Sequence, residues 1–349
     1  MYKKIILRSE YKASERRTPL TPNDAKKLLE KGIVVDVESS KNRIYSDKDY
    51  EDVGCKIISE HAWEKVQDQN LLILGLKELP LSFEKIHGKH MYFAHIFKGQ
   101  TDAPKVFKQY EKGEGTLYDL EFLQDENKRR VAAFGYWAGF VGGTLALKHY
   151  LEKNSNRDWS LNSFDSIDDM KKELFEEFNE IEKIKVLIIG ARGRCGKGAV
   201  DALSAFGVEL TKWDRKETTG KSQFPEILEH ELFINCVYLQ SKIPPFISKE
   251  NYGDDAKLKV VSDVSCDPNS PWNPIPIYNE LTSWDRPYRE TNIKGLDIVA
   301  IDNLPSALPK ESSDDFSSQL LPTLLNQIEN KHIWQTSLDY FERIKDEIL

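Results

Sequence analysis

Short apolar runs alternate with amphipathic stretches along the first third of the chain. The apolar runs are residues 5–7, 33–37, 71–76 and 91–97. Nearly continuous runs of this kind are typical of strands buried on both faces of a sheet. Between the first two runs, Thr21 and Pro22 predict the start of a helix, because Thr is a favoured N-cap and Pro fits the first helical position. This alternation of strand and helix predicts a parallel α/β sheet.

The middle of the chain changes character twice. Residues 135–152 are apolar and rich in Gly and Ala, which predicts a helix packed closely on its neighbours. Residues 153–183 are polar and acidic, and we expect a surface helix there because apolar side chains recur at helical spacing: Met170, Leu174, Phe178 and Ile181. A second alternating pattern follows, with strands predicted over 184–190, 208–214, 232–239 and 258–264, and with a helical tail from about residue 315.

Composition narrows the class of protein. The chain has 349 residues, a length typical of two domains, and 49 Lys and Arg against 57 Asp and Glu give a net charge of −8. This balance argues against a general nucleic-acid or membrane-surface binder. No apolar run approaches the ~18 residues of a membrane span. The four cysteines form no CxxC pair, so we expect a reducing, cytoplasmic protein without a metal site.

A glycine-rich turn follows the strand predicted at 184–190. It contains Gly190, Gly193 and Gly196, and Asp214 stands at the end of the next predicted strand. Such glycines let the backbone approach a pyrophosphate at a helix N-terminus, and the acid binds the ribose hydroxyls, which favours NAD over NADP. Arg215 and Lys216 weaken that preference. The alternative is a turn that only packs a helix on a sheet.

Two cysteines lie near this turn. Cys195 is in the turn, and Cys236 lies near the end of the strand that we take as fourth in a sheet of order 3-2-1-4. Those strand ends would be neighbours, and a reversible disulfide between the thiols could block the cofactor site. Two inert buried thiols are the simpler interpretation.

Lys77 follows the buried strand predicted at 71–76, and His95 lies within the one predicted at 91–97. Ligands of open α/β sheets bind at the carboxyl ends of strands. Either residue could transfer protons. Either could equally be structural, Lys77 as a solvated strand end and His95 as a hydrogen-bonded core residue. Basic residues around these strands would suit a ligand with several carboxylates: Arg16, Arg17, Lys98, Arg129 and Arg130.

Several segments resemble the NAD-dependent, lysine-forming saccharopine dehydrogenases, within a superfamily that includes alanine dehydrogenase. They follow in order over nearly the whole chain: residues 15–22, 75–80, 93–100, 117–122, 129–135, 193–196, 273–278 and 301–306. The resemblance implies NAD-dependent oxidation of saccharopine to lysine and 2-oxoglutarate. It also implies an active site between two domains.

The resemblance also implies roles for individual residues. Lys77 would deprotonate the secondary amine, and His95 would act in hydration and collapse of the imine. Residues of the substrate site would be Arg17, Lys98, Gln100, Glu121, Arg130, Phe134, Ser265 and Asp302. Residues of the NAD site would be Arg129, Gly193, Arg194, Asp214, Thr218, Tyr238, Val264, Ile301, Asp302, Asn303 and Leu304.

Some features depart from the fungal pattern of this family. The segment 153–183 has no obvious counterpart, Cys266 replaces a small residue, and Asn303 stands where fungal enzymes carry His. These differences leave open a related amino-acid or opine-type dehydrogenase, such as an alanine-dehydrogenase-like enzyme or an NADPH-dependent lysine–2-oxoglutarate reductase. A non-catalytic NAD-binding sensor is disfavoured by the presence of both Lys77 and His95.

We therefore predict an α/β fold with two Rossmann-like domains. Residues 135–320 would form the NAD-binding domain, and residues 1–134 with 321–349 the catalytic domain. The expected partners are small molecules, namely saccharopine, lysine and 2-oxoglutarate, with neither nucleic acid nor membrane. The sequence leaves the oligomeric state open.

Overall fold

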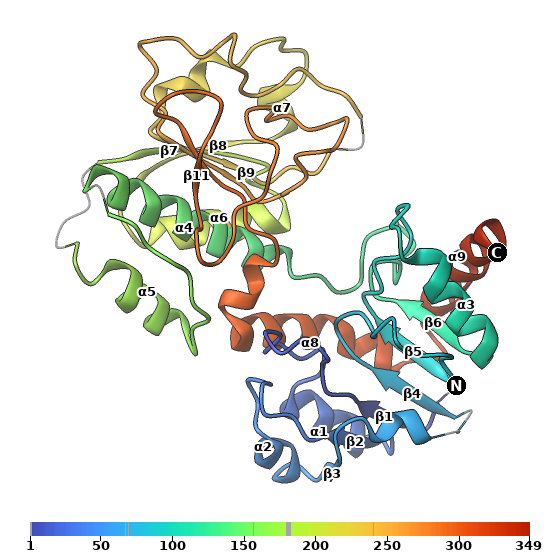
Figure 1. Cartoon of the computed structure of the whole chain (residues 1–349). Helices are drawn as coiled ribbons and strands as arrows, with labels where there is room; N and C mark the ends of the chain where they lie inside the picture. Colours follow the sequence, from blue (N-terminus) through green and yellow to red (C-terminus); the bar gives the residue numbers. More distant parts are fainter. Residues whose placement is uncertain (1, 67, 69, 156, 179–182, 240) are drawn as a thin grey trace. The chain divides into compact units, whose positions relative to one another are not determined.

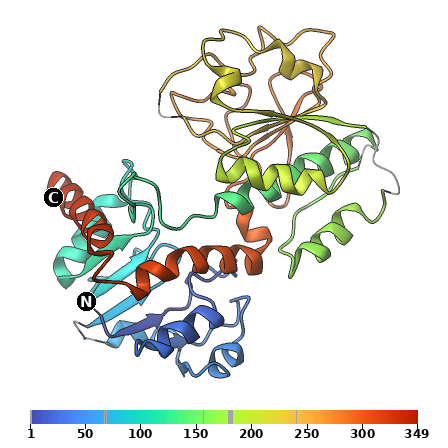
Figure 2. The same cartoon turned by 180° about the vertical axis from the view of Figure 1, so that it is seen from behind.

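The structure is a computed structural model that describes residues 2–66, 68, 70–155, 157–178, 183–239 and 241–349. The chain divides into two compact units (Figures 1 and 2). Unit 1 comprises Met1–Ala133 and Pro309–Leu349, and unit 2 comprises Phe134–Leu308. The predicted boundary at residue 320 falls inside helix α8 (Pro309–Leu325), which lies wholly within unit 1.

Unit 1 is built on a parallel sheet. Its strands are β1 (Lys4–Leu7), β2 (Val34–Glu38), β3 (Lys56–Ile58), β4 (Leu71–Leu74), β5 (Lys89–Tyr92) and β6 (Thr116–Asp119). They are arranged in the order β3-β2-β1-β4-β5-β6. The strand order reverses between β1 and β4, where open α/β sheets bind ligands at the carboxyl ends of their strands.

Helices cover this sheet. They are α1 (Pro22–Glu30), α2 (Asp47–Glu51), η1 (Ala62–Lys65), α3 (Ala103–Gly113), α8 and α9 (Lys331–Ile348). The predicted cap of α1 is confirmed, because the Thr21 side chain accepts a hydrogen bond from the Asp24 N–H and Pro22 opens the helix. The C-terminal helices belong to the same core: Ser317 of α8 donates to Asp24, and Phe341 of α9 stacks on Phe107 of α3.

The strand predicted over 91–97 is wrong in its extent. β5 ends at Tyr92, so His95 lies in the loop that follows. The chain leaves the sheet there because the Ala94 N–H donates to the Asp119 carboxylate instead of a neighbouring strand. His95 also adopts a left-handed backbone, with φ of 52°, which a strand does not accommodate.

Unit 2 contains the second sheet. Its strands are β7 (Lys185–Ile189), β8 (Glu209–Trp213), β9 (Leu232–Asn235), β10 (Val260–Asp263), β11 (Arg289–Glu290) and β12 (Asp297–Val299). The order is β11-β12-β10-β9-β7-β8, with only β11 antiparallel among the described strands. The expected order 3-2-1-4 is therefore wrong. The strand before Cys236 is β9, the third described strand of this unit and not the fourth. It does pair with the first strand, β7, as expected.

The helices of unit 2 are α4 (Gly135–Asn154), α5 (Ile167–Phe175), α6 (Arg194–Ser204), α7 (Arg215–Thr218), η2 (Pro225–Glu229) and η3 (Leu304–Ala307). The close packing predicted for the Gly-rich helix is confirmed. A Cβ at Gly139 of α4 would lie 1.8 Å from the Cys195 carbonyl oxygen of α6, and one at Gly198 would lie 1.9 Å from the Tyr136 carbonyl oxygen. Only glycine lets the two helix backbones approach this closely.

The acidic surface helix is shorter than predicted. Among the described residues between Ser155 and Phe178, only those of α5 are helical, and this helix ends at Phe175. Met170 and Leu174 face the core, whereas Phe178 follows the helix and is partly buried. Ile181, the last member of the predicted stripe, lies outside the described residues.

Candidate active site

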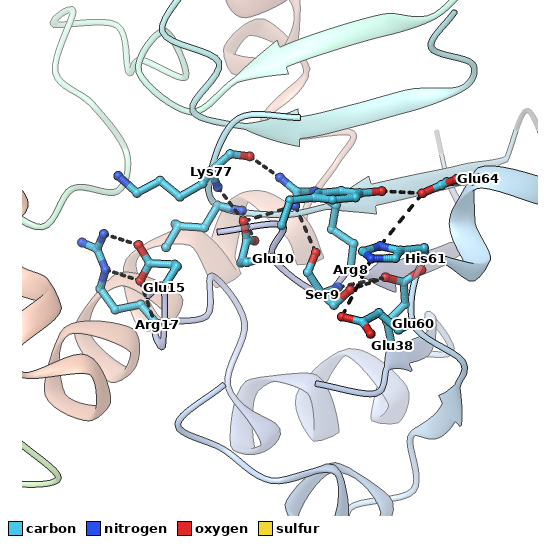
Figure 3. Close-up of polar contacts among 12 residues, drawn as sticks. Arg8, Ser9, Glu10, Glu15, Arg17, Glu38, Glu60, His61, Glu64 and Lys77 are labelled. Carbon is cyan, nitrogen blue, oxygen red and sulfur yellow. Dashed lines mark hydrogen bonds and ion pairs between the residues drawn. The ribbon is translucent and has the colours of Figure 1, made fainter. Parts of the chain in front are cut away.

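In unit 1, the ends of β4, β5 and β6 carry ionisable side chains that lie close together. Lys77 follows β4 and is only 7% exposed. Glu15 lies near it and forms a bidentate ion pair with Arg17, at 2.8 and 2.7 Å. Burial alone would raise the pKa of Glu15, but the charges of Arg17 and Lys77 lower it. Figure 3 shows the Lys77 side chain extending past this pair.

His95 is held by a carboxylate from the β4 loop. Its Nδ1 forms a short hydrogen bond with Glu78, and both side chains are partly exposed. Burial raises the pKa of Glu78, whereas the hydrogen bond and the nearby charges of His95 and Lys77 outweigh it and bring the pKa to about 2. Glu78 is therefore a carboxylate at neutral pH. It fixes one nitrogen of the imidazole, which leaves Nε2 for other chemistry.

A second carboxylate, Glu121, follows β6 and forms ion pairs with two cationic side chains. Glu121 accepts a hydrogen bond from Lys98 Nζ at 2.7 Å and a short one from Arg130. Burial raises the pKa of Glu121, but Lys98 and Arg130 lower it overall. The Gln100 side chain accepts from the Lys98 N–H at 2.7 Å, so it orders the same loop. Two cations share one carboxylate, so the cluster of Lys98, Arg130 and Glu121 has one surplus positive charge.

In unit 2, the glycine-rich turn has the shape that a dinucleotide phosphate needs. Gly190 has φ of 83°, and a Cβ at Gly196 would lie 2.1 Å from the Gly190 carbonyl oxygen. The turn leads into α6, whose N-cap is Gly193 and has no capping side chain. Backbone N–H groups at such a helix start are free to bind phosphate oxygens.

A pocket of about 900 Å³ opens beside this turn. Asp214, at the end of β8, is on its wall and accepts hydrogen bonds from the backbone N–H groups of Arg192 and Arg215, at 3.1 and 2.8 Å. Among the predicted cofactor residues, the pocket is lined by Gly193, Asp214, Thr218 and Tyr238. The tight glycine turn, the uncapped helix start and the acid at the end of β8 together fit a nicotinamide dinucleotide.

Comparisons with known proteins place this arrangement in a family. A family model described as alanine dehydrogenase/PNT, N-terminal domain, matches residues 6–141. The chain is 39% identical to saccharopine dehydrogenase [NAD(+), L-lysine-forming] of Neurospora crassa, over 97% of this chain and 95% of that protein. The protein of the same name from Schizosaccharomyces pombe is 38% identical, over 97% of each. The chain belongs to the saccharopine dehydrogenase family.

The fold prediction is confirmed by a solved structure. An L-alanine dehydrogenase superposes with a TM-score of 0.67 over 97% of this chain and 93% of its own, at 17% identity. Identity this low shows the fold alone, and the fold is α/β with two Rossmann-like domains, as predicted. In the part of the chain that the structure describes, no helix is both long and apolar enough to span a membrane.

Other residues that the family resemblance assigned to the cofactor lie outside the walls of the 900 Å³ pocket. Arg194 is the first residue of α6, and its side chain lies near Gly135. Arg129 belongs to unit 1, where it pairs with Asp125 at 2.8 Å and is largely exposed. The rest lie at or beyond the ends of β10 and β12 within unit 2: Val264, Ile301, Asp302, Asn303 and Leu304.

The substrate residues assigned to unit 2 form two further local clusters. Ser265 donates to Asp263 at 2.6 Å, beside a buried Tyr278 that donates to the same carboxylate. Asp302 accepts from the backbone N–H and the side-chain amide of Asn303, at 2.9 and 3.0 Å. Phe134 precedes α4 as its N-cap residue.

The cysteines are all thiols in this structure. The hydrogen bond between Cys236 and Cys195, followed by burial, raises the pKa of the Cys236 thiol well above its usual value. The two side chains therefore lie in contact beside the glycine turn, as the strand pairing predicted. Burial also raises the pKa of Cys266, whose thiol donates to the Asp263 carbonyl oxygen.

Three buried charged residues that support this site were missed in the sequence. Arg8 and Glu10 follow β1, and Asp119 ends β6. Asp119 accepts the N–H groups of Ala94 and Glu121, at 2.8 and 2.7 Å, and so ties the His95 loop to the Glu121 loop. The signal was available, because each of these residues follows or ends a buried strand, as Lys77 does.

Proposed function

We propose that the chain catalyses the reversible NAD-dependent oxidation of saccharopine to L-lysine and 2-oxoglutarate. Two observations together carry the proposal. The chain is 39% identical to a lysine-forming saccharopine dehydrogenase over 97% of its length, and Lys77 and His95 lie beyond the ends of two neighbouring strands. Saccharopine, NAD⁺ and water give lysine, 2-oxoglutarate, NADH and a proton, so atoms and charges balance. Both proton-transfer groups are needed on this route.

Lys77 is proposed as the base for the first half of the reaction. The secondary amine of saccharopine must lose a proton before its carbon can give up a hydride, and a partly buried lysine can take that proton. His95 is proposed for the second half. It would take a proton from the water that adds to the imine and return a proton to the departing lysine nitrogen. The Glu78 carboxylate on Nδ1 would stabilise the imidazolium formed between these steps.

Three cations of unit 1 are proposed to bind the substrate carboxylates. Lys98, Arg130 and Arg17 supply cations, and arginine binds carboxylates through two parallel hydrogen bonds. Gln100 and Glu121 hold or balance these cations. Further substrate contacts are proposed from unit 2: Phe134, Ser265 and Asp302.

The pocket beside Gly193 is proposed as the NAD site. When bound there, NAD would accept the hydride at its nicotinamide ring. Asp214 would hold the ribose hydroxyls and disfavour a 2′-phosphate, while Thr218 and Tyr238 would cover the adenosine half. The residues outside this pocket are proposed to contact the rest of the cofactor: Arg129, Arg194, Val264, Ile301, Asp302, Asn303 and Leu304. A reducing, cytoplasmic location is also proposed, and the four free thiols are compatible with it.

The test is NADH absorbance with purified protein in both directions. Saccharopine with NAD, and lysine with 2-oxoglutarate and NADH, are expected to turn over. NADPH in place of NADH, and pyruvate with ammonia in place of lysine and 2-oxoglutarate, serve as parallel controls. Turnover of pyruvate and ammonia without saccharopine turnover would assign the chain to another amine substrate. Tight NADH binding with no turnover of any of them would leave only the cofactor site.

A further inference from the structure

A buried ion pair lies directly beneath Lys77. Arg8 follows β1, its side chain is fully buried, and its Nη1 lies 3.1 Å from Oε2 of Glu10, whose side chain is 8% exposed (Figure 3). Taking both charges out of water carries a large desolvation cost, so a buried pair is weak evidence for stability. What the pair contacts is therefore more informative than its charge.

Glu10 binds the backbone on the N-terminal side of Lys77. Its Oε1 accepts the Leu76 N–H at 2.7 Å, and its Oε2 accepts the Lys77 N–H at 2.9 Å. These donors are on the loop after β4, whereas Glu10 is on the loop after β1, the neighbouring strand. One carboxylate thus fixes two successive peptide groups of the loop that presents Lys77.

Arg8 binds the backbone on the other side of Lys77. Its Nη2 donates a short hydrogen bond to the Lys77 carbonyl oxygen, and its Nη1 also donates to the Ser9 carbonyl oxygen at 3.1 Å. The guanidinium crosses Gly75 so closely that a Cβ there would lie 2.1 Å from Nε of Arg8. It also lies over the Tyr92 ring, 5.4 Å from the centroid. Arg8 therefore has one well-defined position, set by the loop and by β5.

We propose that Arg8 and Glu10 are positioning residues for Lys77. Together they hold both its N–H and its C=O, and so fix the direction in which its side chain leaves the backbone. A lysine side chain is long and flexible, and a base misplaced by about 1 Å can lose about 100-fold in rate. The inference rests on the proposed function, in which Lys77 is the base.

Glu38 offers a matched control. It is a fully buried carboxylate at the end of β2, on the same edge of the sheet. It accepts the N–H groups of Ser9 and Trp63, both at 2.9 Å, but contacts neither peptide group of Lys77. Glu10→Gln and Glu38→Gln therefore each neutralise a carboxylate that binds two backbone N–H groups at this edge, and only Glu10→Gln disturbs the Lys77 backbone directly.

The experiment is a double-mutant cycle between Glu10→Gln and Lys77→Met in the full chain. Saccharopine turnover, NADH affinity and the pH profile of kcat/KM are measured for each variant. Glu10→Gln is expected to lower kcat about 10- to 100-fold and to leave NADH affinity unchanged. The reason is that the NH₂ of the new Gln side chain would face a backbone N–H that Glu10 now accepts. In the Lys77→Met background the same change is expected to cost less than about twofold, since residues that act as a unit are not additive. Glu10→Gln is expected to move the limb of the pH profile that reports the base, and Glu38→Gln is not.

Two outcomes overturn the inference. One is an equal loss from Glu10→Gln in both backgrounds, and the other is an equal change of the pH profile in Glu38→Gln; either would make Glu10 merely structural. Should Glu10→Gln not fold, Gly75→Ala displaces the guanidinium without changing a charge and is expected to give the same pattern. A Lys77→Met variant that keeps full turnover would instead refute the base assignment of the proposed function, and the inference with it.

Discussion

Nδ1 of His95 forms a hydrogen bond with the Glu78 carboxylate, and the two residues come from loops that follow the neighbouring strands β4 and β5. Parallel strands bring their carboxyl ends to one edge, so residues distant in sequence meet there. Glu10 joins the β1 and β4 loops in the same way, and Asp119 joins the β5 and β6 loops. This edge of unit 1 is thus held by carboxylates that form hydrogen bonds with groups of adjacent loops.

The first prediction concerns stability in acid. The folded-state pKa of Glu78 is about 2, below its ordinary value of 4.5, so its contribution to folding is present above 4.5 and is lost as the pH falls toward 2. Glu78→Gln is expected to remove part of the decline in unfolding free energy over that window. Urea denaturation at pH 3 and pH 6 measures it. Since Glu78 is partly exposed, salt should weaken the effect, and an unchanged slope in Glu78→Gln would contradict it.

Asp119 is expected to act with the opposite sign. Burial raises its pKa from 3.8 to about 6, although hydrogen bonds from Ala94 and Glu121 oppose the rise. The folded state then binds more protons than the unfolded state between these values, so its contribution to stability is present below pH 3.8 and is lost as the pH rises through 6. The loss is roughly 3 kcal/mol. Asp119→Asn should abolish this slope in urea denaturation between pH 4 and 6, with Glu78→Gln as the variant that leaves it intact.

Asp214 is expected to decide between the two nicotinamide cofactors. Asp214→Asn can still cap α7 but loses the charge that disfavours a 2′-phosphate. It should weaken NADH binding and strengthen NADPH binding, measured by fluorescence titration, so that the preference falls about 10-fold or more. Asp214→Ser should lower NADH affinity further because the shorter side chain reaches fewer ribose hydroxyls. An unchanged NADH-to-NADPH ratio in both variants would place the ribose elsewhere.

The glycine contact between α4 and α6 makes a prediction about unit 2. Gly139→Ala gains about 1 kcal/mol in helix propensity, but its Cβ meets the Cys195 backbone, and such overpacking costs about 1–3 kcal/mol. We expect a net loss of unfolding free energy in denaturant titration. Gly253→Ala is the control, because a Cβ there meets nothing within 4 Å. If Gly139→Ala were as stable as the control, the two helices would have to separate at no cost.

Local sequence patterns predicted most helices and strands. They could not predict features that depend on how the strands pair in the sheet. The Thr21 cap and the strands before Lys77 and Gly190 follow from residue order alone. The end of β5 does not, because it depends on Asp119 taking the Ala94 N–H from a strand further along the chain. The position of β9 beside β7 is likewise a property of the whole sheet.

The candidate site shows the same division. Lys77 and His95 stand out as titratable residues at the ends of predicted buried strands, and their roles come from the family resemblance. Arg8 and Glu10 follow a buried strand as Lys77 does, but nothing local in the sequence shows that their side chains are buried against the Lys77 loop. Their importance depends on contacts between β1 and β4, which only the folded chain provides.

The last prediction separates two adjacent arginines that the sequence presents as a pair. Arg130 and Lys98 share the Glu121 carboxylate, so Arg130→Met leaves Glu121 neutralised but removes the surplus cation proposed to bind a substrate carboxylate. The KM for saccharopine should rise about 10- to 100-fold with a smaller change in kcat, as for the loss of a charged hydrogen bond in binding.

Arg129 pairs with Asp125 instead and is proposed to contact NAD. Arg129→Met should therefore weaken NADH binding and leave the saccharopine KM within a few-fold at saturating NAD. Steady-state kinetics and NADH titration of both variants make the comparison. If Arg130→Met changed NADH affinity and Arg129→Met changed the saccharopine KM, the two assignments would have to be exchanged.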